Sequence, residues 1–317
     1  MALTIALAGD TMLGRGVAQH LAERRGPVVA PEVAEVAAQA DLFVLNLECC
    51  ISERGRRWPD PAKPFFFRAP PVAAQTLAAL GVDCVTLANN HALDYGVEAL
   101  LDTFAHLAAV GVAWVGAGAD EDAARAPAVL DAAGQRLTVV GVSDHPPEFA
   151  AGPDSPGIAF ADLGGRGVPD WLASAVAGAD GPVMVSPHWG PNMTAEPIGR
   201  VRASATALRD AGASLVAGHS AHVFHGVRGS ILYDLGDFVD DYAVDERLRN
   251  DLGLMFLATL DGCRLAGLEA VPLKLDYCHT RLALGDEAAW VRRRFRDACA
   301  RLGTEVVESE GRLRVRP

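Results

Sequence analysis

The sequence lacks an excess of basic charge and any long hydrophobic run. Its 317 residues contain 28 Lys and Arg against 40 Asp and Glu, a formal net charge of −12. Such an acidic chain is not expected to bind DNA, RNA or anionic lipid, because those ligands require a basic surface. No run of about 18 apolar residues occurs, so we expect no membrane insertion. Residues 1–10 do not have the features of an export signal, and we therefore expect a cytoplasmic protein.

The sequence also lacks the motifs of several common protein classes. Its six cysteines contain no C-x-x-C pair, which favours reduced, buried thiols over disulfides or a thiolate metal site. No P-loop occurs, and Gly116-Ala117-Gly118 is not followed by the spacing of a dinucleotide-binding motif. The segment 218–222, Gly-His-Ser-Ala-His, departs from a nucleophile elbow at its fifth residue, so Ser220 is a weak candidate nucleophile.

Although only 6% of the chain is aromatic, half of it is hydrophobic, which is enough to bury a core. Short apolar runs alternate with Ala-rich amphipathic stretches, the pattern of βαβ units around a largely parallel sheet. The first half predicts strands at 3–8, 42–47, 84–87 and 113–116, and helices at 17–25, 31–40, 72–80 and 97–109. The second half predicts strands at 137–142, 183–186 and 215–217, and helices at 199–211 and 287–302. Further strand-like runs at 223–227, 231–233, 254–260 and 265–271 indicate an antiparallel sheet, and 150–169 is the best candidate for a linker or long loop.

Five of the predicted strands run directly into polar residues that can bind metal. Ligands of open α/β sheets bind at the carboxyl ends of the strands, so these side chains are expected to converge on one crevice. Carboxylate, amide and imidazole donors without thiolate suit Mn²⁺, Fe²⁺ or Zn²⁺. So many donors exceed the needs of one ion with an open position, which favours two divalent metal ions. The six candidate ligands are Asp10, Glu48, Asn90, His188, His219 and His222.

Each candidate alone has an ordinary structural explanation. Asp10 can cap a helix or close a turn, Glu48 can be solvated, and Asn90 can belong to a turn. A single His after a strand is more often structural than a ligand. The prediction of a site therefore depends on the joint pattern, and above all on His219 and His222 standing so close together.

These residues stand in motifs that resemble the CapA family, the poly-γ-glutamate capsule synthesis branch of the calcineurin-like metallophosphoesterases. The resemblance covers about residues 3–272. It is carried by blocks in the expected order and spacing: 9–16 (GDTMLGRG), 46–48 (NLE), 87–96 (LANNHALDYG), 186–190 (SPHWG), 218–222 (GHSAH) and 233–238 (YDLGDF).

The resemblance implies an α/β fold, a four-layer α/β/β/α sandwich with a dinuclear metal site at the strand ends. It implies a CapA domain over residues 1–275, with 276–317 as a C-terminal helix and strand packed on the same domain. Asp10 would bind one metal, Glu48 would bridge both, and Asn90, His188, His219 and His222 would complete the ligand set. His91 would act as general acid or base, with Asp94 of the same motif as its catalytic neighbour.

Two positions depart from the pattern of the superfamily. Met12 stands where its first motif normally has a His, and Asn46-Leu47-Glu48 replaces the usual acidic second motif. His222 can compensate for the missing imidazole. The expected substrate-binding residues are Arg15, Arg68, Trp189 and Asp237; Asp237 can also act as an outer partner of the metal site. Arg57 and Lys63 are further candidates for binding an anion, although loop charges are often only solvated, and Trp189 can equally pack in the core.

The resemblance implies hydrolysis of a phosphoester by metal-bound hydroxide, acting on a small anionic or peptidic substrate. Two alternatives use the same site: metal-assisted epimerisation, or hydrolysis of a γ-glutamyl or other peptide bond. A third, non-enzymatic interpretation is an accessory factor in poly-γ-glutamate assembly. The sequence does not choose a substrate, because one site supports different chemistries.

Overall fold

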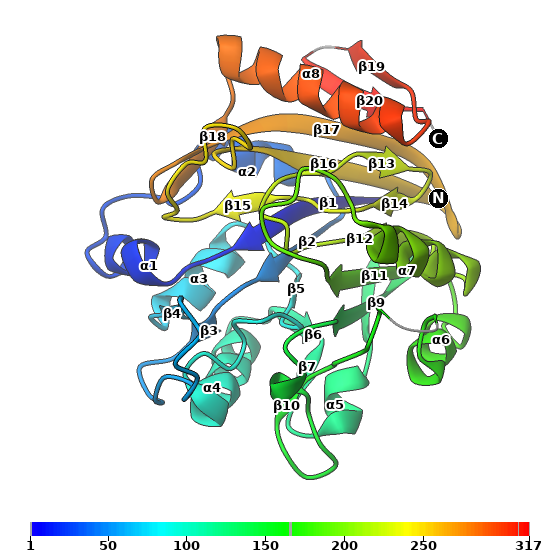
Figure 1. Cartoon of the computed structure of the whole chain (residues 1–317). Helices are drawn as coiled ribbons and strands as arrows, with labels where there is room; N and C mark the ends of the chain where they lie inside the picture. Colours follow the sequence, from blue (N-terminus) through cyan, green and yellow to red (C-terminus); the bar gives the residue numbers. More distant parts are fainter. Residues whose placement is uncertain (1, 165–166, 310, 317) are drawn as a thin grey trace.

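The computed structural model describes residues 2–164, 167–309 and 311–316, and it contains two large β-sheets with helices on their outer faces (Figure 1). Within this described part, the first sheet has ten strands. Eight of them follow the order β19-β20-β17-β16-β1-β2-β5-β6, while β15 pairs with β1 and β18 with β17. Their bounds are β1 Ala2–Thr11, β2 Leu42–Leu47, β5 Cys84–Thr86, β6 Ala113–Val115, β15 Asp237–Val239, β16 Leu252–Asp261, β17 Arg264–Asp276, β18 His279–Leu282, β19 Val306–Ser309 and β20 Arg312–Val315.

The second sheet has six strands in the described residues, in the order β13-β14-β12-β11-β9-β8. Strands β9, β11, β12 and β14 run parallel, as the alternation of strands and helices predicts. Two short pairs, β3 with β4 and β7 with β10, lie outside the large sheets. The bounds are β3 Cys50–Ile51, β4 Arg68–Ala69, β7 Ala117–Gly118, β8 Ala128–Ala132, β9 Gln135–Ser143, β10 Gly157–Ile158, β11 Val183–His188, β12 Leu215–Ala217, β13 Val227–Arg228 and β14 Ile231–Leu232.

Three hydrophobic clusters define the layers. One lies between the sheets and includes Leu7 of β1 and Val139 of β9. A second joins the first sheet to helices α1 to α4, and a third joins the second sheet to α6 and α7. The order of layers is therefore α/β/β/α, as expected. The helices are α1 Arg15–Ala22, α2 Pro31–Ala37, α3 Val72–Ala79, α4 Gly96–Ala109, α5 Glu121–Arg125, η1 Pro147–Phe149, α6 Asp170–Ala177, α7 Gly199–Asp210 and α8 Gly285–Arg301.

The C-terminal segment joins the first sheet. Strand β20 pairs with β17, and α8 lies along the same sheet, with Val291 and Phe295 in the cluster between the sheets (Figure 1). Among the described residues, no helix is both long and apolar enough to cross a bilayer. The predicted strand at 223–227 is wrong over most of its length, because only Val227 belongs to a strand and the preceding residues form a buried loop.

A cluster of ion pairs around the buried Asp251 lies at the start of the hairpin of β16 and β17. We expect it to make the stability of the fold depend on pH. Arg249 donates to both oxygens of Asp251, at 2.7 and 2.8 Å, and Lys274 Nζ lies 3.0 Å from Asp251 Oδ2. Burial opposes ionisation of Asp251, but these cations outweigh it and lower the pKa of the carboxyl. The ionised form therefore stabilises the fold above the ordinary Asp pKa, and that contribution disappears as pH falls through the lowered value.

We expect Asp251→Asn to lower the free energy of unfolding by about 1–3 kcal/mol at pH 7. The difference from the unsubstituted protein should shrink below about pH 4. Urea unfolding at both pH values measures it, with the exposed Asp261→Asn as the control variant. A difference that does not change with pH would contradict the assigned role of the Asp251 charge.

Candidate metal centre

The polar residues at the strand ends meet at one edge of the two sheets. Asp10 lies near the end of β1 and Glu48 directly follows β2, both in the first sheet. His188 is the last residue of β11 in the second sheet, and it forms a parallel β-bridge with His219 just beyond β12. Asn90 and His91 follow β5. Because the carboxyl ends of these parallel strands share one edge, residues distant in sequence become neighbours, as the strand pattern predicts.

Asp10 lies at the middle of this cluster and is fully buried. Its Oδ1 accepts a hydrogen bond from Asn46 Nδ2 at 2.8 Å and lies 3.0 Å from His219 Nδ1. Its Oδ2 lies 3.4 Å from His222 Nδ1. Burial favours the neutral carboxyl, but the hydrogen bond from His219 and the positive field of the imidazoles outweigh burial. They hold the pKa of Asp10 well below its usual range, so this group is an anion ready to bind a cation.

Glu48 is also fully buried, but neither of its carboxylate oxygens has a hydrogen-bond partner. The nearest ring nitrogens are His91 Nε2 at 3.8 Å and His188 Nε2 at 3.9 Å from Oε1. Burial, reinforced by the negative charge of Asp10, raises the pKa of Glu48 well above its ordinary value. Two further buried atoms at these strand ends, His188 Nε2 and Asn90 Oδ1, have no partner either.

Buried polar atoms without partners are rare in folded proteins, so a cluster of them requires an explanation. Those of Glu48, His188 and Asn90 are carboxylate, imidazole and amide atoms of the types that bind metals. Asp10, Glu48 and His188 each offer one ligand atom within 4.8 Å of the others, and Asp10, His222 and Asp237 form a second such group. Carboxylate and imidazole donors at this spacing fit a divalent transition metal. Asp10 belongs to both groups.

The loop between His219 and His222 has a strained backbone. Ser220 has φ of 107° and His222 has φ of 59°, values that side-chain-bearing residues rarely adopt. The strain is held by hydrogen bonds from Ser220 N to Asp10 and from Ala221 N to Asp234. Backbone strain of this kind concentrates at functional sites, and here it brings both imidazoles next to the Asp10 carboxylate.

His91 is held with one ring nitrogen toward the centre. Its Nδ1 lies 2.7 Å from Asp94 Oδ2, while Nε2 faces Glu48. Asp94 is itself fixed by Phe67 N at 2.6 Å and by Lys63 Nζ at 3.0 Å. Burial lowers the pKa of His91, and the Asp94 carboxylate opposes that shift. The pair has the geometry of an oriented acid–base group, with Asp94 acting through His91.

Two cavities reach the cluster. One, of about 290 Å³, is lined by His91 and His222 together with Arg15, Phe65, Asn192, Met193, Tyr242, Ala243 and Asn250. The other, of about 540 Å³, is lined by Asn90 together with Trp58, Pro59, Asp60, Pro61, Lys63, Pro64, His145, Pro146, Glu148 and Phe149. Neighbouring residues of one motif, Asn90 and His91, therefore line different cavities.

The expected substrate-binding residues do not lie in one cavity. Arg15 lines the smaller cavity, where its guanidinium lies over Tyr242 and pairs with Asp241 at 3.1 Å. Arg68 instead stacks on Tyr95 and donates to the carbonyl of Arg54.

Trp189 is 2% exposed and its Nε1 donates to the carbonyl of Tyr233, so it packs in the core of the second sheet. Asp237 is buried against His222 and lines neither of the two cavities. Of the expected substrate-binding residues, Arg15 therefore lines a cavity beside His91 and His222, whereas Arg68 stacks on Tyr95 and Trp189 packs in the core.

The sequence-based prediction gives no role to two residues near the centre. A third residue has a role in the structure that differs from the predicted one. Asn46 donates to Asp10, and Asp234 holds the strained loop. Lys63, a candidate for binding an anion, neutralises Asp94. Asn46 stands two residues before Glu48, so the strand alternation that places one on this face also places the other. For Asp234 and Lys63 the sequence offers only loop positions, and their partners become visible in three dimensions.

The fold and the site define an α/β sandwich protein with a carboxylate- and imidazole-rich cluster at its strand ends. Residues 4–242 match the family described as "Bacterial capsule synthesis protein PGA_cap", and the chain belongs to this family. The family assignment agrees with the motif resemblance to CapA proteins.

Named relatives agree with this assignment, and a solved structure has a similar fold. The chain is 34% identical over 357 aligned positions to a protein of Mycobacterium tuberculosis H37Rv named "Probable polyglutamine synthesis accessory protein", covering 96% of this chain and 93% of that one. It is 28% identical to the "PGA biosynthesis protein CapA" of Bacillus subtilis, over 75% of this chain and 63% of that one. A hypothetical protein from Thermus thermophilus has a similar fold, with a TM-score of 0.50 at 14% identity, covering 86% of this chain and 100% of that one.

Proposed function

We propose that the protein is a metal-dependent hydrolase that cleaves a phosphoester at a dinuclear centre. The ligands would be Asp10, Glu48, Asn90, His188, His219 and His222. The observation that carries the proposal is the set of buried donor atoms without partners at the strand ends, next to an oriented His in a cavity wall. Two bound ions of Mn, Fe or Zn would polarise the phosphoryl oxygens and activate water.

The residues of this chain have separate roles in the proposed reaction. His91 Nε2 faces the centre and, in the protonated state of the ring, would donate a proton to the leaving oxygen, while Asp94 keeps the ring in that orientation. Arg15 would bind a negative group of the substrate in the smaller cavity, because its guanidinium is held there by Asp241 and by aromatic faces. Asn46 and Ser220 N would fix the Asp10 carboxylate.

The two cavities favour a substrate with groups on both sides of the bond that breaks. A phosphate monoester would occupy one cavity, whereas the two arms of a phosphodiester would lie in the cavity beside His91 and the cavity beside Asn90. We therefore propose a diester or another extended anionic substrate. Interactions with both arms would contribute to transition-state binding.

Hydrolysis of a γ-glutamyl or other peptide bond is the second candidate for the same site. The names of the relatives mention synthesis and an accessory role, and not hydrolysis. Epimerisation, with His91 moving a proton next to a carbonyl group, is a further alternative, as is a non-enzymatic accessory role in polymer assembly. Exchange of substrate hydrogen for deuterium from D₂O without hydrolysis would identify the epimerase. A cytoplasmic location stays a prediction.

The first experiment measures metal content and turnover on the same preparation. We expect about two transition-metal ions per chain by elemental mass spectrometry. Bis(p-nitrophenyl) phosphate should be hydrolysed at least about tenfold faster, in kcat/KM, than p-nitrophenyl phosphate. A γ-glutamyl p-nitroanilide tests the peptide alternative, and chelator-stripped protein is the control. Protein that binds no metal after reconstitution with Mn²⁺, Fe²⁺ or Zn²⁺ would overturn the proposal.

A further inference from the structure

We infer that Asp237 is itself a metal ligand, and that with Asp10 and His222 it forms an oxygen-rich position suited to Mn²⁺ or Fe²⁺. This inference rests on the proposed metal centre and extends it. On sequence alone, Asp237 is expected to bind substrate or to act as an outer partner, and the six expected ligands do not include it.

The pairing of two strands places Asp237 beside Asp10. Strand β15 runs parallel to β1, and Asp237 is the residue opposite Asp10 in that pairing. His222 Nδ1 lies 2.8 Å from Asp237 Oδ1 and 3.4 Å from Asp10 Oδ2. Ligand atoms of the three residues lie within 4.8 Å of one another, which leaves a common point that all three can reach.

The free oxygen and the acidic surroundings, which include the neighbouring Asp240 carboxyl, both favour a bound cation. Asp237 is 1% exposed, and its Oδ2 has no hydrogen-bond partner. Within the described residues, the ion pairs of Asp10, Glu48 and Asp237 involve only imidazoles, with no Lys or Arg. Three buried carboxyl groups without a fixed positive charge are costly in a metal-free protein, and a divalent ion would neutralise them.

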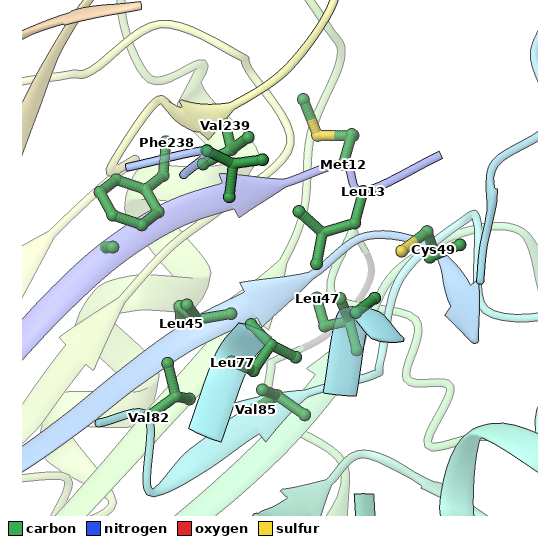
Figure 2. Close-up of a cluster of buried hydrophobic side chains, with 14 of the residues drawn as sticks. Met12, Leu13, Leu45, Leu47, Cys49, Leu77, Val82, Val85, Phe238 and Val239 are labelled. Carbon is green, nitrogen blue, oxygen red and sulfur yellow. The ribbon is translucent and has the colours of Figure 1, made fainter. Parts of the chain in front are cut away.

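Met12 contributes no ligand to the Asp10 side of the centre. It stands two residues after Asp10, where the superfamily that the motif resembles normally has a His. Its side chain is fully buried and lies with Leu13 in the hydrophobic cluster between the first sheet and its helices, so it belongs to the core (Figure 2). Asp237 brings an oxygen donor to the Asp10 side of the centre from another strand, and two carboxylates with one imidazole favour a harder ion than an imidazole-rich set does.

The competing interpretation is that Asp237 only orients the His222 ring through Nδ1. Outer partners of metal-bound His residues commonly do this. The two roles respond differently to Asp237→Asn. The amide oxygen can still accept the hydrogen bond from His222, so an orienting role survives the change. A charged ligand is lost, because a neutral amide binds the ion far more weakly.

The test is the number of Mn²⁺ ions bound by metal-loaded full-length protein, from elemental analysis and from the electron paramagnetic resonance signal of coupled Mn²⁺ pairs. We expect two coupled ions in the unsubstituted protein. In Asp237→Asn and Asp237→Ala one ion should remain, with binding of the second weakened more than about 100-fold, beyond the loss typical of an outer partner. Asp241→Asn, on the same segment but paired with Arg15, is the matched control and should keep two.

The outcomes separate this inference from the proposed function. Two coupled ions in Asp237→Asn, bound as tightly as in the unsubstituted protein, would overturn the ligand role and leave the metal centre intact. No ions in the unsubstituted protein would instead overturn the proposed function. Circular dichroism of the metal-free variants checks that both still fold.

Discussion

Replacing Glu48 by Gln is expected to remove metal from the centre and to lower kcat by at least roughly a thousandfold. Glu48 is the buried carboxylate whose two oxygens both lack a partner, and the imidazoles of His91 and His188 face it. A neutral amide of the same shape cannot supply the charged ligand that the proposed centre needs. Metal content and turnover are measured on the same sample, with the exposed Glu53→Gln as the control.

In the metal-free protein, by contrast, Glu48→Gln should not destabilise the fold. Burial raises the pKa of Glu48, and a group whose pKa is raised on folding stabilises the protein below its unfolded pKa and loses that contribution as pH rises. At pH 7 and above, the metal-free protein therefore carries the cost of this carboxyl group, and Gln removes the cost.

Metal-free Glu48→Gln is thus expected to unfold at the same or a higher temperature than the metal-free parent at pH 8, with the difference vanishing near pH 4. Thermal unfolding of both metal-free proteins measures it. A variant that keeps two ions and full turnover would contradict the role of Glu48 as ligand. A lower unfolding temperature at pH 8 would show that the carboxylate has a structural partner.

The sequence predicts the position of the centre because parallel strands impose it. Asp10, Glu48, Asn90, His188 and His219 each follow a run of buried apolar residues. The rule that such strand ends share one edge needs no knowledge of which strands are neighbours. The alternation of apolar runs and amphipathic stretches likewise predicts the four longest helices of the first half, and strands β1, β2, β5 and β6, to within a few residues.

Other features depend on contacts that no local pattern contains. The apolar run at 223–227 predicts a strand, yet Val223 and Phe224 are buried in a loop, because an apolar run reports burial and not backbone conformation. Helix α6 lies directly after the long loop and is not predicted, for the opposite reason: its short amphipathic pattern stands among Gly and Pro.

The side chains around the ligands show the same limit. Arg68 and Trp189 stand beside metal-site motifs in sequence, but one stacks on Tyr95 and the other packs under the second sheet. Asp237 is far from Asp10 in sequence, and only the pairing of β15 with β1 brings the two carboxylates together. Proximity in a motif therefore predicts which side chains gather at the strand ends, and it does not predict the partners of Arg68 and Trp189.

His91→Asn is expected to keep the metal content and to lower kcat by about 10²–10⁴-fold. His91 Nε2 faces the centre at 3.8 Å from Glu48, and no hydrogen bond to Nε2 ties it elsewhere in the described residues. Asn leaves the cavity open, but its amide cannot act as an acid because it does not ionise near neutral pH. Metal analysis and steady-state kinetics measure the two effects, and His106→Asn on α4 is the control.

The dependence on the leaving group distinguishes a proton donor from a group that merely binds substrate. An ester whose leaving oxygen is a weak base needs little protonation, so His91→Asn should impair its hydrolysis less than that of an alkyl ester. Asp94→Asn should show the same trend with a smaller loss, because it acts by orienting the ring through the 2.7 Å contact with Nδ1. Equal losses for both esters would assign His91 to substrate binding, and loss of metal would make it a ligand.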